Sequence, residues 1–461
     1  MSYLPTQEQT MLRDSARAFL SEQAPVAQLR SLRAQATGDG FDRALWQRFA
    51  GLGFTGMLVP EAHGGLGLGH ADAGLLLQEI GRHLSVLPFS ASAIVAASAI
   101  RAAGSEAQRA ALLPAMASGE RIAALAVDER SKHDPQQIAL SARRDGDGWV
   151  LNGSKTFVEF GHAADLLVVA ARTGSAPGDI GLFVLPQGTP GLQTERVAMV
   201  DAQASARLVL QDVRLGADAL LGAPDQGGAA LQAALDAGRA AAAAELLGIA
   251  DEVFARTLAY LKERRQFDRV IGEFQALQHR AAVLMVDIEL ARAAVGQALQ
   301  ALDANPAQAS AAVSVAKSRA GRSALLAVQE GVQMHGGMGM TDEFEMGFFM
   351  KRVRVLQERY GDAGFHDTMY HLPVVRHAVI ASAFGIRFQG QGFFLTDART
   401  HRGTSGAPVV TRDAAAGAAL PWKLLGVHSS RFDMGGRDMA QDESLGLNCA
   451  WYADILLTLT G

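Results

Sequence analysis

The chain has 461 residues, 49% hydrophobic and 19% charged, a balance that favours a folded protein of about three domains and argues against disorder. Its net charge of -5 and pI near 6.2 give no basic signature for nucleic-acid binding, and no apolar run reaches the roughly 18 residues of a membrane span. A single cysteine, Cys449, excludes an internal disulfide and a cysteine-built metal site, and the start of the sequence lacks a secretory pattern, so we expect a cytoplasmic protein.

Residues 1–120 form the first predicted domain, which is helical from residue 5 because apolar residues recur there every three or four positions. Thr6 followed by Gln9 is a plausible capping box for the first helix. Residues 59–69, VPEAHGGLGLG, interrupt the helices and predict a glycine-rich loop. Over 121–225 short apolar runs separated by Gly, Asn, Asp and Pro predict a β domain.

Helical periodicity returns over 226–362 in long, alanine-rich stretches, which predict a helical bundle. One helix is expected to run through ERRQFDRVIGEFQALQHR, Glu263 to Arg280, where two adjacent arginines stand near an apolar stripe. We interpret this helix as meeting a large, partly anionic ligand. Residues 363–461 again consist of short strand-like runs and predict a separate all-β unit.

Motifs along residues 1–362 resemble those of the acyl-CoA dehydrogenase family. In chain order they are PEAHGGLGLGHADAGLLLQEIGR, GDGWVLNGSKTFV, YLKERRQFDRVIGEFQALQHRAA and VQMHGGMGMTDEF. The resemblance implies an N-terminal α domain, a middle β-barrel domain and a C-terminal four-helix bundle. It also implies FAD as cofactor, α,β-desaturation of an acyl-CoA as activity, an electron-transfer acceptor, and an oligomer. Within the family the chain looks most like the small subunits of two-component members such as pimeloyl-CoA dehydrogenase.

The resemblance implies two groups of FAD contacts. Residues 155–159, KTFVE, match the segment that lies against the isoalloxazine ring, with Phe157 and Val158 facing the flavin. Glu159 stands where the family has a threonine that donates a hydrogen bond to the flavin, and an ionised carboxylate cannot donate. Contacts to FAD held mainly by a neighbouring subunit are implied for Arg264, Gln266, Phe267, Gln275, Gln333, Gly336 and Gly337.

The residue types in the second group suit a dinucleotide. Arg264 offers the pyrophosphate a planar, permanently charged fork of donors. Phe267 can pack on the adenine or ribose, and Gln275 can donate and accept at once. The glycines of QMHGGMG would let backbone amides approach closely, because glycine has no Cβ. Taken alone, Arg264 reads as a solvated helix residue and the glycines as a helix-terminating turn; beside the other motifs, the FAD reading is favoured for Arg264.

The family reaction needs a glutamate base that takes the α-proton while a hydride passes to the flavin. Counting from the glycine motif puts the base at Tyr360, and matching the tyrosine-centred motif puts it at Gly361. The family's alternative position, immediately before Arg239, is Gly238. None of these residues is a carboxylate. We therefore predict a non-catalytic or weakly catalytic subunit that pairs with a catalytic acyl-CoA dehydrogenase subunit.

Two carboxylates remain near the expected base positions. Asp362 is the candidate base of this chain, although it also reads as a helix-end or turn residue. Glu358 reads as a surface helix charge. Expression of the chain alone with brisk acyl-CoA-dependent dye reduction, lost in Asp362→Asn, would favour Asp362 as base.

Residues 400–410, THRGTSGAPVV, resemble the nucleophile region of trypsin-like serine peptidases, with Ser405 at the nucleophile and the amides of Gly403 and Ser405 at the oxyanion hole. The similarity covers about 364–461, the second of that fold's two barrels, so we expect a half-barrel with an uncovered apolar face. The triad histidine and aspartate have no counterpart, and without a base Ser405 is an ordinary alcohol. Alternatives are therefore a hydrolase acting through Ser405, a scaffold that has lost FAD, and a plain turn in a natural or artefactual fusion.

Overall fold

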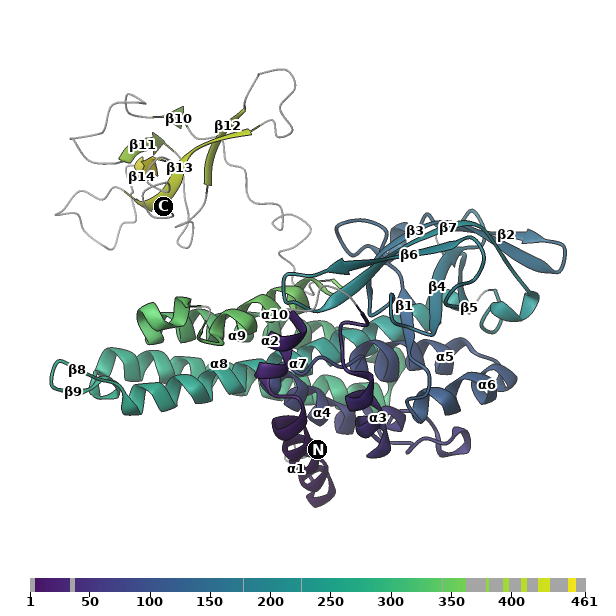
Figure 1. Ribbon diagram of the computed structural model, residues 1–461, viewed down its shortest axis with the longest axis horizontal. Coiled ribbons are helices and arrows are strands. Elements are labelled where there is room, and N and C mark those ends of the chain that lie inside the picture. The colour runs from purple at the N-terminus through teal and green to yellow at the C-terminus, as the bar shows by residue number, and fades with distance from the viewer. Residues whose placement is uncertain are drawn as a thin grey trace. The chain divides into compact units, whose positions relative to one another are not determined.

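The computed structural model describes residues 5–33, 38–176, 178–224, 226–341 and 343–361 in full, and the backbone of strands between residues 379 and 452. The chain divides into two compact units, Met1–Phe365 and His366–Gly461. In the first unit the sheet of the middle region lies against helices of the N-terminal region, and long C-terminal helices continue beside them (Figure 1).

The N-terminal region is helical, as predicted. The capping box is confirmed: Thr6 accepts from the Gln9 backbone at 3.2 Å, and the Gln9 side chain accepts from the Thr6 backbone at 3.1 Å. The glycine-rich loop is tightly folded, because a Cβ on Gly65 would lie 2.1 Å from the carbonyl oxygen of Val59. The elements are α1 (Gln7–Gln23), α2 (Val26–Arg33), α3 (Arg43–Gly51), η1 (Phe54–Gly56), η2 (Glu61–His63), α4 (His70–His83), the π-helix η3 (Phe89–Ala96), α5 (Ala97–Ala103) and α6 (Glu106–Ala117).

The middle region forms a mixed seven-stranded sheet in the order β1-β4-β2-β3-β7-β6, with β5 paired to β4. Its strands are β1 (Ala123–Ala126), β2 (Ser141–Asp145), β3 (Gly148–Glu159), β4 (Leu166–Arg172), β5 (Ile180–Pro186), β6 (Leu192–Ala198) and β7 (Ala204–Leu215), with turns η4 (Pro135–Gln137) and η5 (Ala217–Ala219). The β3–β7 register shifts between Lys155 and Val158, so residues 156–157 bulge from the ladder. The ladders of the described strands do not close into the barrel that the resemblance implied.

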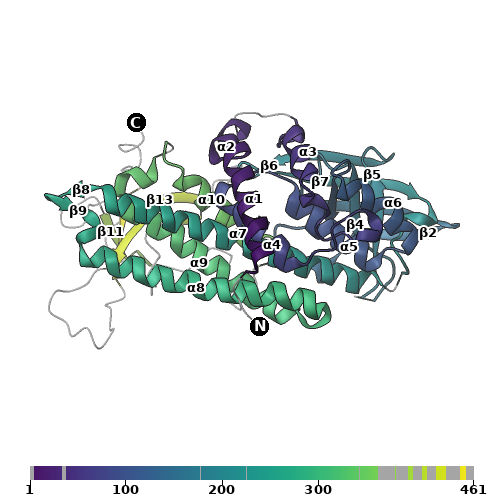
Figure 2. The same ribbon diagram turned by 90° about the horizontal axis from the view of Figure 1, so that it is seen from below.

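The C-terminal region of the first unit is a helical bundle. It contains α7 (Gly227–Glu263), the hairpin β8 (Arg265–Gln266) and β9 (Arg269–Val270), η6 (Ile271–Glu273), α8 (Gln275–Ala304), η7 (Pro306–Gln308), α9 (Ser310–His335), η8 (Gly336–Met340) and α10 (Met346–Glu358). Figure 2 shows α7, α8 and α9 running side by side. Glycine permits a close crossing of α7 and α4, since a Cβ on Gly248 would lie 1.9 Å from the carbonyl oxygen of Gln78.

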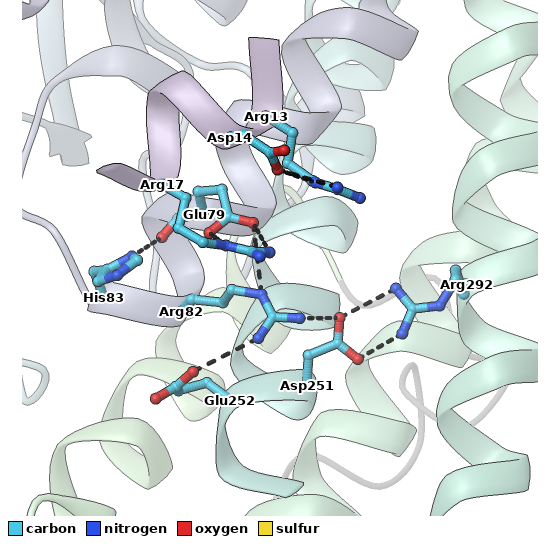
Figure 3. A network of polar contacts seen from close by, with 9 residues as sticks. All are labelled: Arg13, Asp14, Arg17, Glu79, Arg82, His83, Asp251, Glu252 and Arg292. Carbon is cyan, nitrogen blue, oxygen red and sulfur yellow. Dashed lines mark hydrogen bonds and ion pairs between the residues drawn. The ribbon is translucent and has the colours of Figure 1, made fainter. Parts of the chain in front are cut away.

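Ion pairs join the N-terminal helices to the bundle (Figure 3). Arg17 of α1 donates twice to the buried Glu79 of α4, at 3.0 and 2.8 Å. Arg82 of α4 and Arg292 of α8 both donate to Asp251 of α7, at 3.0 Å and at 2.6 and 3.1 Å. These contacts restrict how α1, α4, α7 and α8 can rotate about their axes. The reason is that the bidentate pairs of Arg17 and Arg292 each require the guanidinium and the carboxylate to lie in one plane.

A second, more deeply buried cluster joins the bundle to the sheet. Arg352 of α10 donates to both oxygens of Glu245 on α7, at 2.6 and 3.0 Å, and to Asp201, between β6 and β7, at 2.8 Å. All three side chains are at most 5% exposed. Burial lowers the pKa of Arg352, but the two carboxylates outweigh burial and raise it. The cluster holds the middle sheet at a fixed place on the bundle.

The described strands of the second unit pair antiparallel in the order β10-β11-β14-β13-β12. They are β10 (Val379–Ile380), β11 (Phe393–Asp397), β12 (Pro408–Arg412), β13 (Trp422–Arg431) and β14 (Leu447–Tyr452). The described part of this unit therefore consists of strands, in agreement with the expectation of a separate all-β unit over 363–461. Ser405 and Gly403 lie outside the described residues, and the half-barrel and its uncovered face stay predictions.

Candidate flavin and substrate site

The turn after α10 is held by a half-buried cation of α7 and a buried cation of α9. Arg239 of α7 donates through Nε to the carbonyl oxygen of Tyr360 at 2.9 Å. Lys317 of α9 donates through Nζ to the carbonyl oxygens of Gln357 and Gly361, at 2.9 and 3.2 Å. Tyr360 has a positive φ of 59°, which an L-residue rarely adopts. The contacts of Arg239 and Lys317 therefore hold the backbone of residues 357–361 in a single conformation.

This turn brings the expected base positions together. The ring of Tyr360 packs on Gly238, where a Cβ would lie 2.8 Å from Tyr360 Cε2. Gly361 follows directly, and a Cβ there would lie 3.1 Å from Cδ2 of His133. The two glycines thus lie beside one cluster of side chains, which includes Tyr360 and His133, and neither supplies a carboxylate. Asp362 lies outside the described residues, so its candidacy as base stays a prediction.

Glu159, at the end of β3, brings a carboxylate to this cluster. It is 7% exposed, pairs with Arg359 and accepts a hydrogen bond from the Tyr360 hydroxyl at 3.3 Å. Burial, reinforced by the charge of Glu159, raises the pKa of the Tyr360 phenol well above its ordinary value. Glu159 is therefore an acceptor already occupied by two donors.

The bulge in β3 separates the two residues expected to face the flavin. Phe157 has a φ of 53° and is 42% exposed, so one face of its ring is available to a ligand. Val158 is buried in the core at 1% exposure and can offer a ligand only its backbone. Lys155 anchors the strand: its Nζ lies 2.8 Å from Glu129 and 2.9 Å from the carbonyl oxygen of Val127. Burial lowers the pKa of Lys155 to about 8, although Glu129 opposes this shift.

The expectation of one continuous helix through residues 263–280 is wrong. Helix α7 ends at Glu263, a hairpin and a 3-10 turn follow, and α8 begins at Gln275. Phe267 and Asp268 both have positive φ, as the central residues of a tight hairpin require, and Ile271 N donates to the Arg264 carbonyl at 2.8 Å. The prediction failed because Ile271 and Phe274, whose spacing is helix-like, pack in a small local core and not along one face of a helix.

That local core assembles the second predicted group of FAD residues at one end of the bundle. Leu261, Ile271 and Met334 pack together beneath the hairpin and the end of α9. Gly336 ends α9 with a φ of 62°. The predicted contact residues of this group are exposed: Arg264, Gln266, Phe267, Gln275, Gln333, Gly336 and Gly337.

The two groups of predicted FAD residues lie far apart in one chain. Gly238, beside the Glu159 cluster, and Arg264 are separated by 26 positions along α7, about 39 Å at ~1.5 Å per residue. Glu159, next to Phe157 and Val158 in β3, contacts Tyr360, whose ring packs on Gly238, so the Phe157 group lies toward the Gly238 end of this stretch and the hairpin group at its other end.

The described residues fit FAD at its diphosphate end and in part at its flavin end. Among the described residues Arg264 has no ion-pair or hydrogen-bond partner for its side chain, Phe267 is 81% exposed, and space is open around Gly336 and Gly337. Phe157 offers an aromatic face. Glu159 does not fit the donor role of the family's threonine, because its carboxylate is engaged as an acceptor.

No described helix has both the length and the hydrophobicity that crossing a membrane requires. No group of three or more histidine, cysteine, aspartate or glutamate side chains in the described ranges is placed to hold a metal ion.

Comparison with known proteins identifies the family. The N-terminal, middle and C-terminal domains of acyl-CoA dehydrogenase match residues 6–120, 124–213 and 225–371. Mitochondrial isovaleryl-CoA dehydrogenase of Pongo abelii is 30% identical over 395 residues, 83% of this chain and 90% of that protein. A variant of the Tcur3481-Tcur3483 steroid ACAD is 34% identical with a TM-score of 0.70, covering 77% of this chain and 94% of that one.

A further solved structure, the ChsE4-ChsE5 complex from Mycobacterium tuberculosis, is 25% identical with a TM-score of 0.71, covering 79% of this chain and 96% of that one. Members of the matched family are FAD-dependent oxidoreductases that act on acyl-CoA thioesters. With its three domains matched in order, this chain belongs to the acyl-CoA dehydrogenase family.

Proposed function

We propose that the chain is a subunit of an FAD-dependent acyl-CoA dehydrogenase whose FAD sites are each completed by a second polypeptide. The observation that carries the proposal is the separation of about 39 Å along α7 between Arg264, in the hairpin group, and Gly238, which contacts the Tyr360 ring next to Glu159. Each group is half of a site, so a second subunit must bring the complementary half.

FAD, when bound, accepts the hydride that leaves the β-carbon of the acyl-CoA. Arg264 binds the diphosphate, and Phe267 packs on the adenosine side. Gln266, Gln275, Gln333, Gly336 and Gly337 complete this half through amide groups. Phe157 and the backbone of Val158 contact the flavin in the other half, where Glu159 holds Arg359 and Tyr360 in place.

The second polypeptide is either another copy of this chain or a catalytic subunit that bears the glutamate. Glycine at positions 238 and 361 leaves glutamate-based proton abstraction to such a subunit. The name of the ChsE4-ChsE5 complex shows that one relative assembles from two proteins. An apolar surface suits a subunit contact: five side chains on α8 and α9 are 54–65% exposed, namely Val283, Met285, Val286, Leu290 and Val315.

The proposal is tested by the visible spectrum of the purified, assembled protein with and without added FAD. We expect bound oxidised flavin in the wild type and at least tenfold weaker FAD binding in Arg264→Met. Arg48→Met, an exposed arginine of α3, is the matched control and should bind FAD like the wild type. A colourless protein that takes up no FAD would contradict the proposal. Brisk dye reduction by the chain alone, lost in Asp362→Asn, would contradict the need for a glutamate-bearing subunit.

A further inference from the structure

One buried histidine has a nitrogen that nothing in the described structure uses. His133 lies between β1 and β2, and its side chain is 5% exposed. Its Nδ1 lies 2.7 Å from Asp128 Oδ1, whereas Nε2 is buried with no hydrogen-bond partner among the described residues. Buried polar atoms are normally paired, so an orphaned ring nitrogen calls for an explanation.

The contact with Asp128 fixes the tautomer of a neutral His133. An ionised carboxylate can only accept, so Nδ1 must carry the proton that it shares with Asp128. Nε2 then holds a free lone pair, which makes it an acceptor for a proton. A carboxylate that orients an imidazole in this way also stabilises the charge that the ring gains on protonation.

The position of the pair formed by His133 and Asp128, here called the dyad, suggests a role for this lone pair. The ring edge that carries Cδ2, the atom bonded to Nε2, faces Gly361 with 3.1 Å between Cδ2 and the position of a Cβ. Gly361 is one of the positions where the sequence motif places the missing glutamate. Asp128 is close enough to affect the ionisation of both Tyr360 and Lys155, so the dyad belongs to the same cluster as Glu159.

We propose that the His133–Asp128 dyad is a proton acceptor for the α-carbon of the acyl-CoA, in place of the absent glutamate. The α C–H bond breaks, its proton passes to His133 Nε2, and its electron pair forms the α,β double bond with loss of the β-hydride, for which bound FAD would be the acceptor. Asp128 stays ionised and holds the imidazolium. The inference rests on the proposed binding of FAD and acyl-CoA by this chain, and it gives the chain a proton-transfer site that uses no glutamate.

Proton abstraction can be measured without hydride transfer. A 3-thia acyl-CoA has sulfur in place of the β-carbon, so it can exchange its α-protons but cannot give a β-hydride. The FAD-loaded protein in deuterated water should catalyse α-deuterium uptake, measured by mass spectrometry. His133→Gln should lower the rate at least 100-fold, the lower end for a lost general base. His162→Gln is the control, since His162 is also partly buried with one unpartnered ring nitrogen, and it should exchange like the wild type.

A second readout needs neither FAD nor substrate. Nitrogen-15 spectra of the histidine side chains in the full chain should show His133 protonated at Nδ1 when neutral, and Asp128→Asn should change that tautomer balance and slow exchange. Exchange that persists in His133→Gln, or that is lost in Asp362→Asn instead, would overturn the inference. Absence of exchange in a wild type that binds FAD and the thia ligand would also overturn it. Failure to bind either ligand would instead overturn the proposed function.

Discussion

Removal of Arg352 tests whether the buried ion cluster holds the sheet on the bundle. The change Arg352→Met keeps an unbranched chain of similar length and deletes three charge-assisted hydrogen bonds, of 2.6, 3.0 and 2.8 Å. It leaves Glu245 and Asp201, each 2% exposed, without their cation. Loss of one partner from a buried pair costs about 3–5 kcal/mol, because the remaining charge stays desolvated.

The free energy of unfolding can be measured by urea titration at pH 7.5, followed by the circular dichroism of helices, since the described helices all lie in the first unit. Arg354→Met is the matched control, because Arg354 is on the same helix but 57% exposed in its pair with Glu358. A surface pair of this kind contributes at most about 1 kcal/mol. An equal decrease in the free energy of unfolding for the two variants would refute the conclusion that Arg352 holds the sheet on the bundle.

Two further predictions concern packing and pH. Gly248→Ala should lower the free energy of unfolding by about 1–3 kcal/mol or more, because the new Cβ would lie 1.9 Å from the Gln78 carbonyl oxygen. Gly347→Ala is the control and should not destabilise the protein, because space is open around Gly347 and alanine favours a helix. The folded pKa of Lys155, about 8, lies below its ordinary value of 10.5, so the unfolded state binds more protons between these values and the contribution of Lys155 to stability rises with pH there. Comparison of thermal midpoints from pH 8 to 10 should show this rise in the wild type relative to Lys155→Met, and an unchanged difference would count against the shift.

Helices, strands and their order were predictable from the sequence because apolar periodicity is a local signal. The boundary at Glu263 was not, since residues 264–274 carry helix-like apolar spacing. The positive φ of Phe267 and Asp268 has no sequence signal as clear as an Asn-Gly pair, and Ile271 is apolar because it packs on Leu261 and Met334.

Residues of the candidate site that lie in, or were aligned from, family motifs were predictable from the sequence, whereas the contacts among them were not. The motifs identified the glycines at 238 and 361 and the departure at Glu159. They could not show that Glu159 binds Arg359 and Tyr360, which lie 200 and 201 positions further along the chain. His133 was missed because an aspartate five positions before a histidine is a weak signal until folding brings the two side chains together.

The most direct test of a FAD site shared between subunits is complementation between two defective chains. Arg264→Glu disables the hairpin half and Phe157→Glu the flavin half, and the two chains carry different affinity tags so that mixed assemblies can be isolated. Each variant alone should be colourless, whereas the mixed assembly should bind FAD, because one of its interfaces joins two intact halves. Mixed assemblies as colourless as the single variants would contradict a site shared between two copies of this chain, and full FAD binding by either variant alone would contradict any FAD site shared between subunits.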